Sequence, residues 1–393
     1  MPGPLKFLEN ARPIAKAAVG GFSLTLGVTG PSGPSSFGFG SNAFTSIGSG
    51  GTITINWGID NTTESFTLTR STVPGFSTWF VSSSISPRPC GSTITISGPN
   101  TINYMTLNKS TTGNIFSITG SYPTSLENLS IQFGAVPTWT PPNIENINLL
   151  GATGPSSFTG GSKLIYFTSS LNLASLNLTA STKLTNLILT STEFTTLPTL
   201  PSSLLELTTP PNITSLSGLP AKLTYLGLFL STELTTLPTL PSSLLRLQTP
   251  PNITSLSGLP TNLTSLNLIA STKLTSVNLG SATKLTTLTG LPASLLELTT
   301  PPNITSLPVL PSSLTSLNLT ASTKLTSVNL SGLTQLTQVP GLPKSCTTLN
   351  LTGCTGIRKI KLDSTIVKTA IFTDSGITEP SLFLVPQSCN YTF

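Results

Sequence analysis

The sequence predicts a mainly β protein, in which a parallel β-solenoid follows an N-terminal domain of antiparallel strands. The segment Ser191–Pro220 returns almost unchanged as Ser231–Pro260, and such fixed-period similarity is typical of solenoids. Within these repeats the apolar residues follow the pattern L-x-x-L-x-L. Upstream, residues 41–98 alternate apolar and polar side chains between turn signals, which is typical of half-buried strands.

The leucine pattern explains why the repeats should stack. Its last two leucines are two residues apart, so they lie on one face of a short strand. One such strand cannot bury its leucines alone, but stacked copies form a parallel sheet over a continuous core. Three clear examples are Leu223, Leu226 and Leu228; Leu263, Leu266 and Leu268; and Leu314, Leu317 and Leu319.

This pattern resembles leucine-rich repeats. The segments LPTLPSSLLEL, LPTLPSSLLRL and LPVLPSSLTSLNL resemble the short repeats of bacterial secreted effectors, and the resemblance covers residues 160–372. It implies a leucine-rich-repeat-type parallel β-solenoid, in which an Asn after each strand bonds the turn backbone. Residues expected in that role are Asn212, Asn252 and Asn303, with Ser231, Ser271, Ser322 and Cys354 in other coils.

A second repeat has a different offset. Thr264–Leu279 returns as Thr315–Leu330 with one change, Ile269/Thr320, at an offset of 51 residues instead of 40. Either the solenoid has two near-equivalent sides that exchange roles after Leu274, or about 11 residues loop out near Gly280–Gly290. Leu285 and Leu288 continue the pattern there, which favours the exchange.

Four segments follow from these patterns. Residues 1–20 are predicted as an N-terminal anchoring arm with a short helix over Leu5–Val19, interrupted at Pro13. Residues 21–99 are predicted as a β-sandwich, 100–372 as the solenoid, and 373–393 as a C-terminal cap over the last strand edge. Strands are expected at Thr52–Trp57, Ser65–Arg70, Thr78–Ser82 and Thr93–Ser97.

The N-terminal domain carries its own resemblance. The segments INWGIDN and TITISG, placed before a leucine-rich solenoid, are similar to PKD/Ig-like β-sandwich domains of bacterial and viral surface proteins. Those domains usually contain W-G-D-G and a later H-x-Y, whereas this chain has Trp57, Gly58, Ile59 and Asp60 and no histidine. Trp57 is expected in the sandwich core.

Composition argues against catalysis. The chain has no histidine, which excludes Ser-His-Asp and Cys-His catalysis and histidine metal sites, and its 12 acidic residues lie singly. No phosphate-binding glycine motif follows a strand. We therefore predict no enzyme activity, no catalytic residue, no cofactor and no metal.

Charge and cysteine usage add further expectations. Only 8% of residues are charged, and the net charge is +6. The positive residues cluster only between Arg358 and Lys368, and we interpret this cluster as a solvated cap of the solenoid and not as a nucleic-acid site. No apolar run is long enough to insert into a membrane. Cys346 and Cys354 are expected as buried thiols, while pairing of Cys90 or Cys389 stays open.

The repeats differ at outward positions, where a binding surface would lie. Glu206, Arg246 and Glu297 occupy one such position, and Thr208, Gln248 and Thr299 another. Tyr225 and Phe229 place aromatic groups where other coils carry Ser, Thr or Ile. Neutral drift at exposed sites is the first explanation of such differences. The alternative is a recognition surface, for which the candidates are Glu206, Tyr225, Phe229, Arg246 and Gln248.

Three functions follow, all non-enzymatic. The first is a virion structural or adhesion protein of tail-fibre, receptor-binding or capsid-decoration type. Its arm would bind other virion proteins, its solenoid would bind a host-surface protein or glycan, and it would lie at the virion surface. Further copies of the same chain, in a homo-oligomer, are the remaining candidate partner. The second is a bacterial extracellular or cell-surface adhesin. The third is an ice- or crystal-binding solenoid, suggested by possible rows of Thr264, Thr275, Thr286, Thr315 and Thr326.

Overall fold

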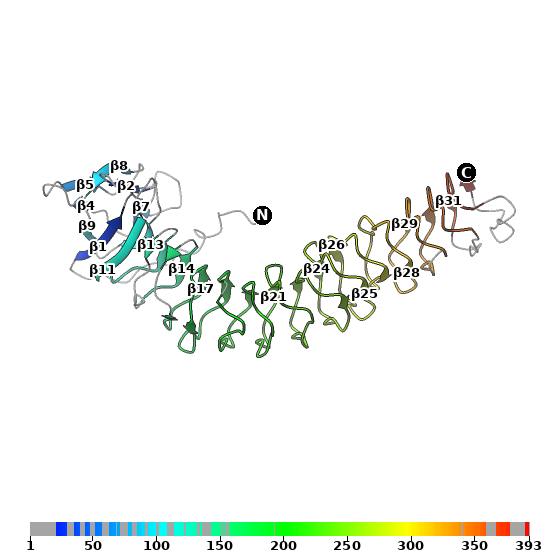
Figure 1. Cartoon of the computed structure of the whole chain (residues 1–393), viewed down its shortest axis with the longest axis horizontal. Helices are drawn as coiled ribbons and strands as arrows, with labels where there is room; N and C mark the ends of the chain where they lie inside the picture. The colour runs from blue at the N-terminus through cyan, green and yellow to red at the C-terminus, as the bar shows by residue number, and fades with distance from the viewer. Residues whose placement is uncertain are drawn as a thin grey trace. The chain divides into compact units, whose positions relative to one another are not determined.

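The protein is mainly β and divides into two compact units, residues 1–184 and 185–393. The computed structural model (Figure 1) describes residues 21–29, 35–39, 44–47, 52–56, 63–67, 69–70, 78–80, 85–90, 93–99, 102–107, 114–121, 123–131, 134–135, 143–150, 152–153, 157–191, 193–338, 341–358, 367–377 and 390–392. No helix occurs among these residues. The predicted arm, Trp57 and Cys389 lie outside them.

The first unit begins with antiparallel strands, close to those expected from the sequence. One sheet has the order β11 (Asn114–Ser121), β1 (Gly21–Thr29), β9 (Thr93–Pro99), β4 (Thr52–Asn56) and β5 (Thr63–Thr67). A separate pair is formed by β2 (Ser35–Phe39) and β8 (Ile85–Cys90). β11 comes from the stretch assigned to the solenoid, yet it pairs with β1. The PKD-like sandwich and the limits of the four segments stay predictions.

The same unit then changes to parallel stacking. Successive strands add in the order β10 (Ile102–Leu107), β12 (Asn128–Ile131), β14 (Asn146–Leu149) and β17 (Tyr166–Ser169), while on the other side of β10 lie β3 (Phe44–Ile47), β7 (Thr78–Phe80) and β6 (Thr69–Arg70). Two short parallel pairs accompany them, β13 (Gly134–Ala135) with β15 (Ala152–Thr153) and β16 (Ser157–Thr159) with β18 (Ser175–Asn177). Residues that follow one another along the chain therefore form adjacent coils.

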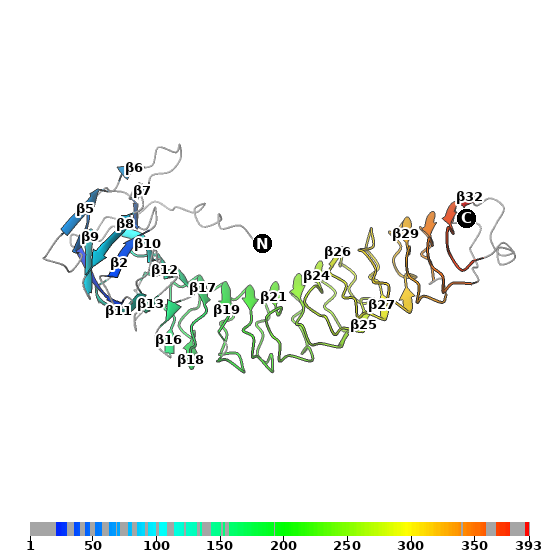
Figure 2. The ribbon, with the colours of Figure 1, turned by 45° about the horizontal axis from the view of Figure 1, so that its top comes forward.

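The second unit is a parallel β-solenoid with two sides. The first side holds β19 (Asn186–Leu189), β20 (Glu206–Thr208), β21 (Tyr225–Gly227), β22 (Arg246–Gln248), β24 (Ser265–Asn267) and β26 (Thr287–Thr289). The second side holds β23 (Ser255–Leu256), β25 (Ser276–Asn278), β27 (Glu297–Thr299) and β28 (Ser316–Asn318). Figure 2 shows β21, β24 and β26 along one side of the stack, with β25 and β27 along the other.

A further parallel sheet follows these two sides. It contains β29 (Ser327–Asn329), β30 (Thr348–Asn350), β31 (Thr369–Ile371) and β32 (Asn390–Thr392). Figures 1 and 2 place β29 on the same side as β24 and β26. β32 belongs to the segment predicted as a cap, and it extends the stack by one more strand on β31.

The leucine pattern builds the core as predicted. Leu223, Leu226 and Leu228 are fully buried, and so are the matching leucines of neighbouring coils. Burial of each such side chain contributes about 2 kcal/mol, and only the adjacent coils can supply the apolar surroundings. The predicted leucine-rich-repeat-type parallel β-solenoid is confirmed.

Buried hydroxyl pairs close one corner of the coils. The Oγ atoms of Thr249 and Ser271 lie 2.6 Å apart, and Ser271 Oγ also donates to the carbonyl oxygen of Pro250 at 2.7 Å. The same arrangement joins Thr209 to Ser231 and Thr300 to Ser322. The corner role predicted for these serines is confirmed, and each serine bonds a buried threonine of the preceding coil.

The asparagines expected at that corner lie elsewhere. The Asn252 side chain donates to the carbonyl oxygen of Thr232, and that of Asn303 donates to the carbonyl oxygen of Thr283, one coil earlier. These residues directly precede a buried isoleucine at the start of a coil, and they are only partly buried. The predicted bonding to backbone is therefore right for Asn252 and Asn303, whereas their equivalence to the buried serines is wrong.

The 51-residue offset is an exchange of sides. β24 lies on the first side, whereas its copy β28 lies on the second side next to β27. No looped insertion occurs at 280–290, because β26 pairs with β24 there and Leu285 is fully buried. The predicted exchange is confirmed.

This exchange also interrupts the first side. The Leu-Pro-x-Leu-Pro segments at 197–201, 237–241 and 307–311 all lack strand structure, since proline has no N–H to donate to a ladder. The first two segments belong to coils that form the second side, but after the exchange the third falls on the first side, between β26 and β29. β26 and β29 consequently belong to different sheets.

The exchange divides the threonine rows suggested for ice binding between the two sides of the solenoid. Thr264 and Thr286 precede strands of the first side, whereas Thr275 and Thr315 precede strands of the second side. Two of these hydroxyl groups are engaged within the stack: Thr264 Oγ1 donates to the carbonyl oxygen of Leu245, and Thr315 Oγ1 to that of Leu296, both at 3.0 Å.

Candidate functional site

Three of the five candidate binding residues begin neighbouring strands. Glu206, Tyr225 and Arg246 are the first residues of β20, β21 and β22, and the parallel register pairs them directly. Strands in such a sheet lie about 4.8 Å apart, so their side chains contact one another on the outer surface. The near-identical repeats supply Glu206 and Arg246, and the coil between them supplies the tyrosine.

Arg246 contacts the adjacent Tyr225 and reaches across it to Glu206, two strands away. Its guanidinium carbon lies 4.9 Å from the centre of the Tyr225 ring, and its Nη2 atom lies 2.7 Å from Glu206 Oε1. The other carboxylate oxygen of Glu206 accepts from Asn186 Nδ2 at 2.7 Å. Because the Arg246 side chain is 54% exposed and that of Glu206 39%, this ion pair contributes little to stability. It instead fixes the positions of the guanidinium group and the ring.

Tyr225 lies along the sheet because the next outward position is a glycine. A Cβ atom at Gly227 would be 2.8 Å from Tyr225 Oη and 3.0 Å from Thr208 Oγ1. In the space this glycine leaves, Tyr225 Oη donates to Gln248 Oε1 at 3.0 Å. Gln248 is thereby joined to the cluster of Glu206, Tyr225 and Arg246.

The surroundings raise the pKa of Tyr225. Burial is the largest cause, and the Glu206 carboxylate adds to it, while the hydrogen bond with Thr208 and the charge of Arg246 oppose it. The hydroxyl group is therefore protonated at neutral pH and acts as the donor to Gln248.

Exposed apolar side chains surround this cluster. Leu205 and Leu245 are 37% and 41% exposed, and Phe229 and Ile269 are 40% and 72% exposed. Leu205 and Leu245 precede β20 and β22, whereas Phe229 and Ile269 follow β21 and β24. We call the outer surface formed by Leu205, Glu206, Tyr225, Phe229, Leu245, Arg246, Gln248 and Ile269 the Tyr225 surface.

Sequence analysis missed Leu205, Leu245 and Ile269 as surface residues. Both leucines had a usable signal, because the L-x-x-L spacing from Leu204 to Leu207 and from Leu244 to Leu247 assigns the first leucine of each LL pair to the core and leaves the second one outside the pattern. Ile269 had a usable signal, since it is the single change between Thr264–Leu279 and Thr315–Leu330. An apolar residue that replaces threonine at an outward position indicates a surface with a different role.

A shallow hollow of about 290 Å³ lies at one end of the Tyr225 surface. Phe229 and Ile269 form its apolar walls, and its other lining residues are Gln248, Thr249, Asn267 and Ala270. The coil between the two walls carries Thr249 and Pro250, and both are buried. No large side chain projects there, which leaves the space open.

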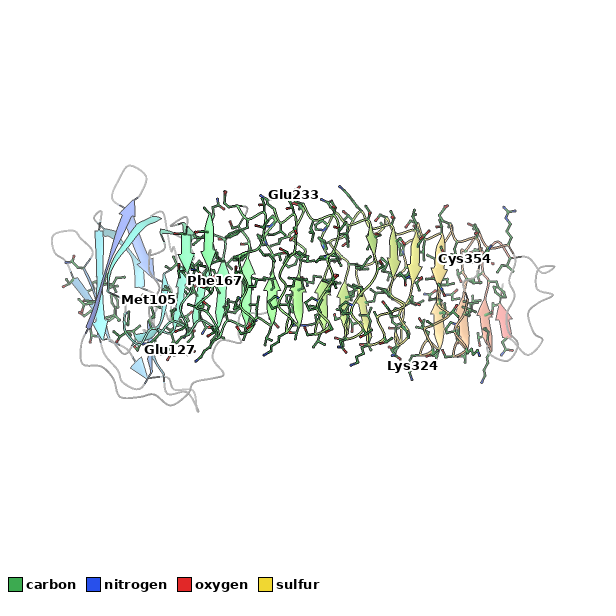
Figure 3. The ribbon with its side chains drawn as sticks, turned by 90° about the horizontal axis from the view of Figure 1, so that it is seen from below. Met105, Glu127, Phe167, Glu233, Lys324 and Cys354 are labelled. Atoms are coloured by element: carbon green, nitrogen blue, oxygen red, sulfur yellow. The ribbon has the colours of Figure 1, made fainter. Side chains whose placement is uncertain are left out.

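Glu297 and Thr299 do not join this surface. Both lie in β27, on the second side of the solenoid, where Glu297 Oε2 accepts from Ser276 Oγ at 3.1 Å. Glu297 therefore occupies the same position of the sequence repeat as Glu206 and Arg246, but it lies on a different side of the solenoid. Figure 3 shows a similar separation at the corners, with Glu233 and Lys324 at opposite margins of the stack.

The two described thiols are buried, as predicted. Cys346 Sγ donates to the carbonyl oxygen of Thr348 at 3.3 Å, and Cys354 Sγ to that of Leu330 at 2.9 Å. Burial raises the pKa of both thiols, while bonds to backbone partly oppose the shift. Both groups stay protonated at neutral pH and are poor nucleophiles.

The part of the chain that the structure describes contains no group of three His, Cys, Asp or Glu residues able to hold a metal ion. Among the same residues, no helix has the length and apolar character needed to cross a membrane.

Comparison with known proteins gives only loose likenesses. No protein-family model matches the chain, and no curated protein sequence matches it. Among solved structures, YopM from Yersinia enterocolitica WA-314 has 20% sequence identity and a TM-score of 0.36, with 74% of this chain and 72% of YopM covered. The functional domain of InlJ from Listeria monocytogenes, which includes a cysteine ladder, has 14% identity and a TM-score of 0.36, with 77% and 74% covered. The solenoid described above rests on this chain's own strand pairing.

Proposed function

We propose that this protein is a non-enzymatic binding protein that holds a protein partner on the Tyr225 surface. The observation that carries the proposal is the clustering of exposed apolar groups. Six large apolar side chains of the second unit are exposed among the residues described, and four of them, Leu205, Phe229, Leu245 and Ile269, belong to this surface.

The same positions in other coils carry threonine, which makes the cluster distinctive. Thr224, Thr264 and Thr286 stand where Leu205 and Leu245 stand in alternate coils, and Thr320 stands where Ile269 does. Exposed apolar groups gain free energy when a partner removes them from water, whereas threonine is already suited to a solvated sheet. Tyr and Arg at the centre are the residue types that most often anchor a protein partner.

The setting of this binding is a finer proposal. We propose a virion structural or adhesion protein that attaches through its N-terminal arm and presents the solenoid to a host-surface protein. The hydroxyl-rich surface with few charges supports an extracellular position. Location on a bacterial cell surface is the alternative. Mass spectrometry of purified particles and of a cell-surface fraction distinguishes the two, since each location predicts enrichment in one preparation only.

The binding role is tested by crosslinking in the enriched preparation. The variant combines Leu205→Thr, Leu245→Thr and Ile269→Thr, each of which introduces the residue that other coils use at that position. We expect the solenoid to fold normally and the crosslinked partner to be lost. A partner that crosslinks equally to the variant and the wild type contradicts the proposal.

A further inference from the structure

The hollow between Phe229 and Ile269 has walls and a rim of different chemistry. Its two apolar walls come from coils on either side of the one that carries Gln248 and Thr249. Coils are about 4.8 Å apart, so the walls are separated by roughly twice that distance. This width admits one aliphatic or aromatic side chain in contact with both walls.

The polar groups at the rim are hydrogen-bond donors. Gln248 Oε1 already accepts from Tyr225 Oη, and Asn267 Oδ1 accepts from the backbone N–H of Ile269 at 2.9 Å. Each side-chain amide is thus held by its oxygen, and no hydrogen bond is made by Gln248 Nε2 or Asn267 Nδ2 among the described residues. Thr249 Oγ1 is turned inward to Ser271 and to the carbonyl oxygen of Asn267.

These features select among ligand classes. The hollow lies at the lower limit of the roughly 300–1,000 Å³ typical of small-molecule sites, and because it is shallow and open it encloses little of a free small molecule. A glycan hydroxyl group can accept from these two amides, but a glycan carries no aliphatic or aromatic side chain to fill the space between Phe229 and Ile269. A polypeptide presents carbonyl acceptors together with apolar side chains, which matches both the rim and the walls.

We propose that this hollow receives one apolar side chain from an extended protein segment, whose backbone carbonyl groups accept from Gln248 Nε2 and Asn267 Nδ2. This inference rests on the proposed function and names the part of the partner that the Tyr225 surface recognises.

The test uses the full chain and a displayed library of random linear peptides about 12 residues long. Selected peptides are synthesised, and their dissociation constants are measured by fluorescence anisotropy. We expect the selected peptides to share an apolar residue. Ile269→Thr removes one wall, and Gln248→Glu replaces the rim donor with an acceptor while keeping the bond from Tyr225. Each change should weaken binding about ten-fold, the effect of losing one well-placed contact.

The chain offers a matched control. Thr320→Ile places the same apolar residue at the equivalent position of the copy, on the second side of the solenoid, and should leave peptide affinity unchanged. Failure to select any peptide, or selected peptides that bind Ile269→Thr and Gln248→Glu as tightly as wild type, overturns the proposal. Glycan-array binding that is lost in Ile269→Thr overturns it as well.

The two proposals fail in different ways. Peptides that lose affinity in Leu205→Thr or Leu245→Thr, but not in Ile269→Thr, refute the role of the hollow and leave the Tyr225 surface as a binding surface. In contrast, a crosslinked partner that is retained when Leu205, Leu245 and Ile269 are all replaced refutes the proposed function itself.

Discussion

At the residue scale, Gly227 sets the orientation of the Tyr225 ring because it has no side chain. The glycine lets the Tyr225 ring lie along the sheet, where the hydroxyl reaches Gln248 and Arg246 covers the ring. A larger residue at this position would turn the ring outward. The candidate residues therefore depend on a glycine that carries no functional group.

We predict that Gly227→Ala destabilises the protein by about 1–2 kcal/mol, because the added methyl group displaces the half-buried Tyr225 hydroxyl from Gln248. Urea denaturation measures the change. Tyr225→Ser introduces the residue that another coil of the same side carries at this position, Ser265. In that background, Gly227→Ala should leave the free energy of unfolding nearly unchanged. An equal cost in both backgrounds would show that Gly227 is required for backbone reasons instead.

Glu127 in the first unit gives a pH-dependent prediction. Burial raises its pKa above 4.5, repulsion from Glu145 adds to the shift, and Asn103 and Lys163 oppose it. The folded chain thus holds this proton more tightly than the unfolded chain, and stability falls as the pH rises from 4.5 through the folded pKa. Glu127→Gln should remove this part of the pH dependence, measured by denaturation between about pH 4 and 7. An unchanged slope contradicts the assignment.

At the element scale, each coil is closed by polar groups as well as by leucines. The buried pairs Thr209–Ser231, Thr249–Ser271 and Thr300–Ser322 recur because each hydroxyl must find a partner inside the core. The exposed threonines before the strands instead bond a carbonyl group one coil earlier, as Thr224 does to Leu205. Hydroxyl residues in this chain therefore stabilise the stack in two distinct ways.

We predict that Thr249→Val destabilises the protein by about 1–3 kcal/mol, since Ser271 and the carbonyl oxygen of Asn267 each lose a buried partner. Thr272→Val, at an exposed position of the following turn, is the control and should change stability by less than about 0.5 kcal/mol. Thermal denaturation of both variants makes the comparison, and equal effects would exclude a special role for the buried pair.

The interruption at 307–311 predicts a local weak point. β26 and β29 lack the strand that would join them, so amide protons of this segment are not held by a ladder. Hydrogen exchange followed by mass spectrometry should show faster exchange at 306–310 than in β24 or β28. Pro308→Ser restores a donor and should slow exchange there. Uniform protection across these coils would contradict this view.

At the scale of the whole molecule, the solenoid requires each strand to fall on the side of the stack where its partner strands lie. A deletion of residues 211–250 removes one 40-residue period and joins Pro210 to Pro251 within an unchanged sequence context. We predict a folded protein, because each remaining coil keeps its neighbours. Deletion of residues 211–220 alone removes half a coil, places Tyr225 on the opposite side, and should unfold the stack. Circular dichroism melting curves measure both outcomes, and equal stability of the two deletions would refute the two-sided description.

The sequence by itself determined the solenoid, the burial of its leucines and the exchange of sides at the 51-residue offset. These features are local or periodic, so they are visible in spacing alone. It also identified Tyr225, Arg246 and Gln248, since they break an otherwise regular repeat. The repeat position of Glu297, and those of the threonines in the suggested rows, did not state on which side of the stack each residue falls, because the exchange of sides changes that.

Only the tertiary structure decided which residues share a surface. Parallel register placed Glu206 and Arg246 on either side of Tyr225, close enough to form an ion pair although the two are 40 residues apart, and it separated Glu297 from both. It also showed that Leu205, Leu245 and Ile269 face water and that Phe229 and Ile269 enclose a hollow. The physical reason is that a side chain's exposure depends on what the adjacent coils place beside it, and that is fixed only when the coils stack.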